Sequence, residues 1–235
     1  EDIHKETASQ SFKVPLDEVT PVQRQNAKRV SFGIIYGISE VGLSKQINST
    51  KEEAKSLMDN YLDSKPKVKQ LIKRAEKFGK EHGYTITKQG FRETLFGMYS
   101  NDYGQQSQAI RKCTNTMIQG TGAFLTNTSL IYINKFLKEN NLRSKLALTV
   151  HDSIFGDVPE DEISIVVPMV KKIMISLPIP WLIIEKDGKQ VRYPIDAEMQ
   201  IGKNYHDLVN FDLKEFSKFN NANEYIDNME KQQEG

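Results

Sequence analysis

Four residues at strict four-residue spacing constrain the fold of the first third of the chain more than any other feature. Two cations come first and two aromatic residues follow: Arg24, Lys28, Phe32 and Tyr36. On an α-helix, which rises ~1.5 Å per residue, these side chains would form one stripe spanning roughly 18 Å. We call these four residues the ridge.

Two interpretations of the ridge are open. In the first, Phe32 and Tyr36 lie in a core and the two cations are solvated, as in most amphipathic helices. A core-facing helix normally segregates cations from aromatic residues, however, and the ridge mixes them on one stripe. In the second, the cationic end of the ridge binds a polyphosphate, and the aromatic end binds a base or sugar. The cationic end is the N-terminal end of the helix, where the helix dipole also favours anions. We favour the ligand-binding interpretation.

The local signals around the ridge predict helices. Thr20 is a candidate N-cap, with Pro21 at the first helical position and Gln23 closing a capping box. Gly37 is the candidate terminator. A second capping box opens at Thr50, and a third periodic segment follows Pro66, so we expect residues 21 to 83 to be mostly helical.

After residue 83 the spacing of the apolar residues changes several times along the chain. A small hairpin is predicted over residues 84 to 95, and one or two long helices over residues 105 to 137. Further elements are predicted in this order: strands at 144–150 and 153–159, a helix at 160–176, a hairpin turn at Asp187-Gly188, a last strand in "DAEMQIG", and a weakly ordered helix or coil after Phe216.

Composition excludes little. Thirty-two basic residues balance 31 acidic ones, so the net charge neither indicates nor excludes nucleic acid. One cysteine, Cys113, rules out an intramolecular disulfide and fits a helix-packing role in a reducing compartment. No apolar run approaches the ~18 residues of a membrane span, and no signal peptide is recognisable, so we expect a cytoplasmic protein. The first residue is Glu1, which suggests part of a longer protein.

Two further motifs carry chemistry. Arg111, Asn115 and Gln119 recur at four-residue spacing, followed by Gly-Thr-Gly, and could bond base edges or phosphates; the alternative is a solvated helix face. In "VHDS", Asp152 falls at the predicted turn between two strands, where an exposed carboxylate could bind a hard divalent cation. The alternative is a turn Asp that bonds its own backbone.

The ridge resembles motif B of family A, or DNA polymerase I-like, DNA polymerases, which is R-x3-K-x3-F-x3-YG. The resemblance implies that Arg24 and Lys28 hold the phosphates of the incoming deoxynucleotide, that Phe32 packs by its sugar and that Tyr36 lies beside the nascent base pair. "EDIHKETA" is similar to the D-I-H segment that precedes this helix in the family, which makes His4 a candidate phosphate contact.

The other two motifs resemble the same family. "RKCTNTMIQGTG" is similar to its R-x3-N-x3-QGT segment, which implies that Arg111, Asn115 and Gln119 contact primer-template DNA. Motif C of the family is H-D-E on a hairpin, so His151 matches as a DNA contact and Asp152 as the metal ligand, while Ser153 replaces the acid. "GYTITKQGFRETL" and "AEMQIGKNYHDL" resemble a hairpin and a closing segment of the family, which extends the likeness to about residue 208.

The resemblance implies an α+β fold with the right-hand polymerase architecture, in which helical fingers join part of an antiparallel palm sheet. We expect residues 1–20 to lead from palm to fingers, 21–103 to form the fingers, and 104–235 to form the C-terminal palm with the motif C hairpin and the polar tail. Motif A, D-x-S-Q-I-E, carries the second metal-binding carboxylate in the family and has no counterpart in this sequence. The architecture is therefore expected to be incomplete.

The implied function is DNA-templated DNA polymerisation in replication or repair, with Asp152, Lys28 and Arg24 as catalytic residues. Mg2+ is the implied cofactor, in a two-metal site whose second carboxylate comes from elsewhere. The implied partners are dNTPs, primer-template DNA and an N-terminal segment or subunit with motif A and thumb, as in a split, phage-like polymerase acting in a bacterial cytoplasm. Two alternatives are a non-catalytic, polymerase-derived DNA-binding module and an unrelated helical interaction protein.

Overall fold

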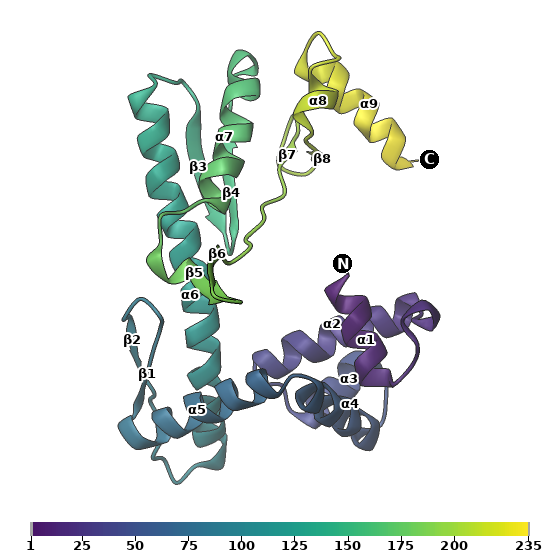
Figure 1. Ribbon diagram of the computed structural model, residues 1–235, viewed down its shortest axis with the longest axis vertical. Helices are drawn as coiled ribbons and strands as arrows, with labels where there is room; N and C mark the ends of the chain where they lie inside the picture. The colour runs from purple at the N-terminus through teal and green to yellow at the C-terminus, as the bar shows by residue number, and fades with distance from the viewer. Residues whose placement is uncertain (1, 235) are drawn as a thin grey trace. The chain divides into compact units, whose positions relative to one another are not determined.

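The computed structural model describes residues 2–234, which form two compact units (Figure 1). The first unit runs to Thr121 and the second begins at Gly122. Both belong to the predicted α+β class, since helices dominate and the strands form small antiparallel pairs. The assignment of segments 1–20, 21–103 and 104–235 to parts of a polymerase stays a prediction.

The first unit is built from helices and one hairpin. Its elements are α1 (Ile3–Phe12), a 3-10 turn (Leu16–Glu18), α2 (Pro21–Ile35), α3 (Glu40–Ile47), α4 (Lys51–Ser64), α5 (Pro66–His82), β1 (Tyr84–Ile86) and β2 (Arg92–Thr94). The helical prediction for residues 21 to 83 is confirmed, including both capping boxes: Thr20 accepts from the Gln23 N–H and Thr50 from the Glu53 N–H. The hairpin at 84–95 is also confirmed.

Two apolar clusters hold the first unit together. One joins α2, α3 and α4 through buried side chains that include Val30, Leu43 and Tyr61. The other joins α5, the loop after β2 and the start of α6 (Tyr103–Glu139) through Ala75, Leu95, Met98, Ala109 and Cys113. Burial raises the pKa of the Cys113 thiol to about 11. The thiol is therefore a packing group, which confirms the predicted helix-packing role.

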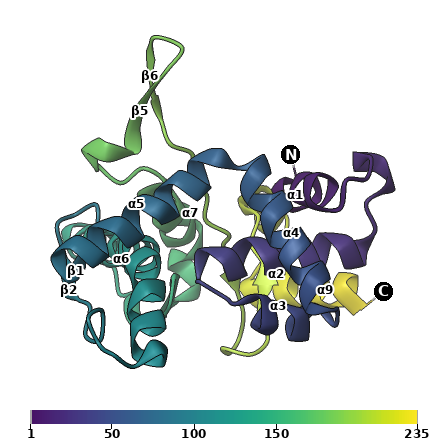
Figure 2. The same ribbon diagram turned by 90° about the horizontal axis from the view of Figure 1, so that it is seen from below.

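The second unit carries three antiparallel strand pairs, and the first of them packs against the end of α6. β3 (Lys145–Val150) pairs antiparallel with β4 (Ser153–Asp157), as predicted, and α7 (Ile163–Ile175) follows a 3-10 turn (Glu160–Glu162). Another 3-10 turn (Pro180–Leu182) leads into β5 (Ile183–Lys186), which pairs with β6 (Lys189–Arg192) around the predicted Asp187-Gly188 turn. Figure 2 shows the β5–β6 hairpin standing out beyond α7.

The C-terminal tail corrects one expectation. A weakly ordered helix or coil is predicted after Phe216; the segment does form a helix, α9 (Ala222–Glu234), but it packs firmly within the second unit, next to α8 (Leu213–Phe216). Tyr225 of α9 is fully buried, and its hydroxyl donates to the Asn210 carbonyl and accepts from the Asp212 N–H. The predicted strand in "DAEMQIG" shortens to β7 (Gln200–Ile201), which pairs with β8 (Val209–Asn210). Within residues 2–234, no helix is both long and apolar enough to cross a membrane.

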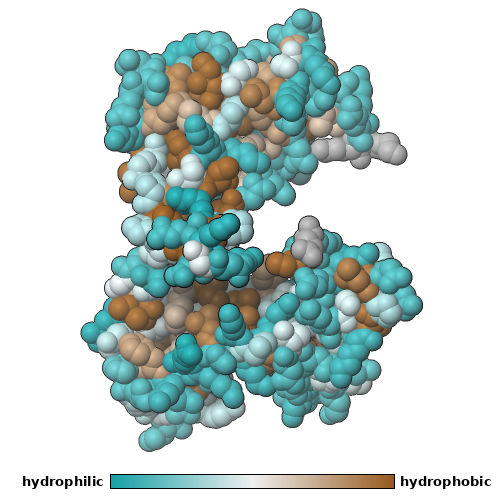
Figure 3. Space-filling model, in the orientation of Figure 1, coloured by the Kyte–Doolittle hydropathy of each residue, from teal (hydrophilic) through white to brown (hydrophobic). Residues whose placement is uncertain are grey.

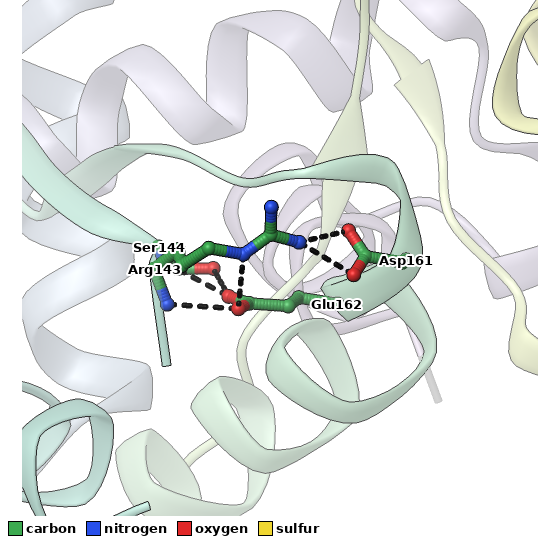
Figure 4. Close-up of polar contacts among 4 residues, drawn as sticks. All are labelled: Arg143, Ser144, Asp161 and Glu162. Atoms are coloured by element: carbon green, nitrogen blue, oxygen red, sulfur yellow. Dashed lines mark hydrogen bonds and ion pairs between the residues drawn. The ribbon is translucent and has the colours of Figure 1, made fainter. Parts of the chain in front are cut away.

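A buried carboxylate fixes the start of β3 against the start of α7 (Figure 4). Glu162 accepts hydrogen bonds from the backbone N–H groups of Arg143 and Ser144 at 2.8 and 2.9 Å, and from the Ser144 hydroxyl at 2.6 Å. The Ser144 hydroxyl and then the Arg143 N–H hold the pKa of Glu162 well below its usual range, at about 2. This contact anchors the strand that leads to the His151-Asp152 turn.

Replacing Glu162 by Gln is expected to lower the melting temperature at pH 7 by several degrees, because Gln cannot accept all three hydrogen bonds. Since the folded-state pKa is lowered from 4.5 to about 2, the stabilisation is present above pH 4.5 and is lost as the pH falls toward 2. The difference in melting temperature between the wild type and Glu162→Gln should therefore narrow over that range. Glu139→Gln, at an exposed position near the end of α6, is the control. A difference in melting temperature between the wild type and Glu162→Gln that does not depend on pH would contradict the account.

Candidate functional site

The ridge lies on the surface of the first unit. The opposite face of α2 is buried through Ala27, Val30, Ser31 and Ile34, whereas Phe32 and Tyr36 are 42% and 44% exposed. The core interpretation of these aromatic residues is therefore wrong. The helix ends at Ile35, so that Tyr36 is its C-cap and Gly37 follows with a φ of +71°, which confirms Gly37 as terminator.

The aromatic end of the ridge is ordered by stacking. The Phe32 and Tyr36 rings are nearly parallel, with centroids 6.4 Å apart, and Lys28 Nζ lies 6.0 Å from the Phe32 centroid. His4 of α1 presents its ring to Phe32 edge-on, with centroids 5.8 Å apart. The structure thus gathers His4, Lys28, Phe32 and Tyr36 in one place.

A groove runs along this part of the ridge. It has a volume of about 730 Å³, within the usual range for small-ligand sites. Lys28, Arg29 and Phe32 line it from α2, Tyr36 lines it from the C-cap of that helix, and Arg111 lines it from α6. The groove therefore combines three cations, Lys28, Arg29 and Arg111, with two exposed aromatic rings, a set of side chains suited to a flat ligand that carries an anionic group.

Arg24 and His4 are held outside the groove lining. Arg24 donates from Nε to Asp2 Oδ2 at 2.7 Å, and this contact is the main reason why the pKa of Asp2 falls to about 2. The His4 Nδ1 atom is buried and has no hydrogen-bond partner within residues 2–234. Asp2 was missed as a site residue, although its place just before a helix could have indicated an N-cap.

The second motif meets the first at the end of α2. Asn115 of α6 donates from Nδ2 to the Tyr36 carbonyl at 3.2 Å. Arg111 packs against Gly37 so closely that a Cβ at that glycine would lie 2.6 Å from Arg111 Cγ. Both residues therefore reach the ridge, whereas Gln119 is exposed farther along α6 and lines no part of the groove.

The third motif lies in the second unit. His151 and Asp152 are the two turn residues between β3 and β4, whose ends pair Val150 with Ser153. Both side chains are exposed, and His151 has a φ of +56°. An exposed carboxylate at the tip of a tight hairpin can take a hard cation if other oxygens complete its shell. Within residues 2–234, no group of three or more His, Cys, Asp or Glu side chains is placed to surround a metal.

Comparisons with known proteins agree on one family. The family model described as DNA polymerase family A matches residues 1–207. DNA polymerase I of Caldicellulosiruptor bescii is 35% identical over 190 residues, which are 80% of this chain and 22% of the relative. The DNA polymerase of Bacillus phage SP01 is 36% identical over 218 residues, 88% of this chain and 22% of the relative. The chain thus spans 22% of the length of each of these curated relatives.

A solved structure gives the same result for the fold. The POL domain of Pol1 from M. smegmatis, in complex with DNA primer-template and dNTP, matches with a TM-score of 0.69 and 34% sequence identity. The match covers 74% of this chain and 31% of that chain. The sequence likeness and the shape likeness therefore point to the same class of protein.

Proposed function

Because the chain belongs to DNA polymerase family A, we propose that it supplies the dNTP-binding fingers and the C-terminal palm portion of a DNA-templated DNA polymerase. The observation that carries the proposal is the groove along the ridge, where Lys28 and Arg111 stand beside the exposed rings of Phe32 and Tyr36. A polyphosphate at the Lys28 end and a base at the aromatic end, where Arg111 packs against Gly37, would match the order of side chains along the groove. In this proposal the fingers are residues 21–103 and the palm portion residues 104–235.

Each ridge residue has a proposed role. Lys28 and Arg24, with His4, neutralise the triphosphate and stabilise the charge that develops on it as the primer 3′-hydroxyl attacks the α-phosphate. Phe32 packs by the sugar, and Tyr36 lies beside the nascent base pair. Closing of the fingers on a correct base pair would test its geometry before chemistry.

Asp152 would hold Mg2+ on the hairpin turn. When bound, the cation supplies Lewis-acid stabilisation of the attacking and leaving oxygens. His151, Arg111, Asn115 and Gln119 are proposed to contact primer-template DNA. Ser153 can offer only a neutral hydroxyl in place of the usual acid, so Asp152 carries the metal role of the hairpin.

The remaining carboxylate is proposed to come from a polymerase segment or subunit that carries motif A and the thumb. Two exposed apolar residues on β3, Leu148 and Val150, support a further strand beside the hairpin, since exposed apolar strand surface favours pairing. Figure 3 shows apolar residues interrupting the hydrophilic surface of the second unit. We propose that this segment contacts the second unit and completes the two-metal site.

A primer-extension assay tests the proposal against a non-catalytic DNA-binding module. The chain, supplied with a polypeptide that carries motif A and thumb, should extend a primed DNA template in the presence of dNTPs and Mg2+. Extension should stop when EDTA is added and resume when Mg2+ is restored. Binding of primer-template DNA without any extension would favour the non-catalytic binding module. Such a module would not need Lys28 in the groove, because it binds no triphosphate.

A further inference from the structure

Asp2 uses its two carboxylate oxygens on two different helices. Oδ1 accepts the backbone N–H groups of His4 and Lys5, both at 3.1 Å, and so caps the N-terminus of α1. Oδ2 accepts the Nε–H of Arg24, in the first turn of α2, at 2.7 Å. One carboxylate thus ties the first turn of α1 to the first turn of α2.

The way in which Arg24 is held leaves most of its donors for a ligand. A guanidinium has five N–H donors in a planar fork, and Asp2 takes the single donor on Nε. Within residues 2–234, none of the four Nη–H donors has a hydrogen-bond acceptor, and the Arg24 side chain is 44% exposed. The contact therefore holds the Nε edge of the guanidinium against Asp2, while its outer end can bind an oxyanion in bidentate fashion.

The same carboxylate also sets the place of His4. His4 lies in the turn that Asp2 caps, and its ring contacts Phe32 of the ridge. Its buried Nδ1 atom has no partner within the residues described. Asp2 therefore links two candidate phosphate contacts, His4 and Arg24, which come from separate helices.

We propose that Asp2 is a positioning residue for the triphosphate: it orients the Arg24 guanidinium and keeps His4 in register with the ridge. The inference rests on the proposed function. The pKa of Asp2, lowered to about 2 chiefly by Arg24, keeps its carboxylate ionised at any pH at which a polymerase is assayed. In a competing role, Asp2 would keep Arg24 away from the triphosphate. Removal of the Asp2 carboxylate would then lower the KM for dNTP, whereas the positioning role predicts that the KM rises.

Asp2→Asn tests the inference in the complete polymerase formed with the motif A segment. Asn caps helices about as well as Asp, but its amide nitrogen cannot accept from Arg24 Nε. We expect the KM for dNTP to rise roughly tenfold, with a smaller change in kcat, because a misplaced binding group weakens substrate contacts. Thr50→Ala, which removes the N-cap of α4 in the same unit, is the matched control and should leave the KM for dNTP unchanged.

A double-mutant cycle separates positioning from general stability. If Asp2 acts through Arg24, adding Asp2→Asn to Arg24→Ala should not raise the KM for dNTP further. The inference is overturned if Asp2→Asn lowers that KM or leaves it unchanged, or if the two effects add fully. If Arg24→Ala leaves the KM for dNTP unchanged, the proposed role of Arg24 is wrong. If Arg24→Ala raises that KM but Asp2→Asn does not, only the inference about Asp2 is contradicted.

Discussion

Asp152→Ala is expected to reduce primer extension by roughly 10³-fold or more, because the variant lacks the carboxylate that we propose as the Mg2+ ligand, whose loss would remove several kcal/mol of transition-state stabilisation. The loss should appear in kcat, with primer-template binding largely retained, and higher Mg2+ concentrations should recover little activity. Single-turnover extension at saturating dNTP measures it. Full activity in the variant would show that Asp152 does not bind the metal.

The chain offers a control for that substitution. Asp187 is also an exposed residue of a two-residue hairpin turn in the second unit, between β5 and β6. Asp187→Ala should therefore reproduce any general effect of removing a turn aspartate while leaving extension intact. If both variants lost primer extension equally, the loss would come from reduced hairpin stability. Only Asp152 is proposed to bind the metal, so a metal role predicts a loss in Asp152→Ala alone.

Lys28→Ala is expected to lower kcat/KM for dNTP by about 10²-fold, since a charge-assisted contact to the triphosphate strengthens as negative charge develops. Lys28 lines the groove and lies over the Phe32 ring, so its loss also leaves the aromatic end without its neighbouring cation. Steady-state extension over a range of dNTP concentrations measures the change. Primer-template affinity should change little, because the expected contact is to the nucleotide.

Lys55→Ala is the control for charge. Lys55 is exposed on α4 in the same unit and lies outside the groove, so its removal changes the net charge equally. It should leave kcat/KM for dNTP within about twofold of the wild type, as expected for a surface charge screened by salt. If Lys55→Ala and Lys28→Ala had the same effect, the groove would not be the triphosphate site.

Local signals predicted most of the secondary structure. The capping boxes at Thr20 and Thr50 start α2 and α4, and the Asp187-Gly188 turn joins β5 to β6, as their sequences indicate. Each of these features depends on residues within four positions of one another. The docked tail was missed because the burial of Tyr225 depends on partners such as Asn210 that come from a separate strand.

The residues of the candidate site were predictable from their spacing in the sequence, but the contacts among them were not. The ridge and the R-x3-N-x3-Q motif identified Lys28, Phe32, Tyr36 and Arg111 as separate candidates. The contact between Asn115 and the Tyr36 carbonyl spans 79 positions, and that between Asp2 and Arg24 spans 22. Such contacts depend on which residues of two packed helices meet, and the spacing of residues within one helix does not give that information.

Photocrosslinking with a deoxynucleotide that carries a photoreactive base tests the central claim, the orientation of the nucleotide along the ridge, most directly. With primer-template DNA and Mg2+ present, the label should fall on the peptide containing Phe32 and Tyr36, and unlabelled dNTP should compete for it. Lys28→Ala should weaken the labelling without moving it. Competed labelling of α4 or α5, or of a peptide from the second unit, would contradict the account.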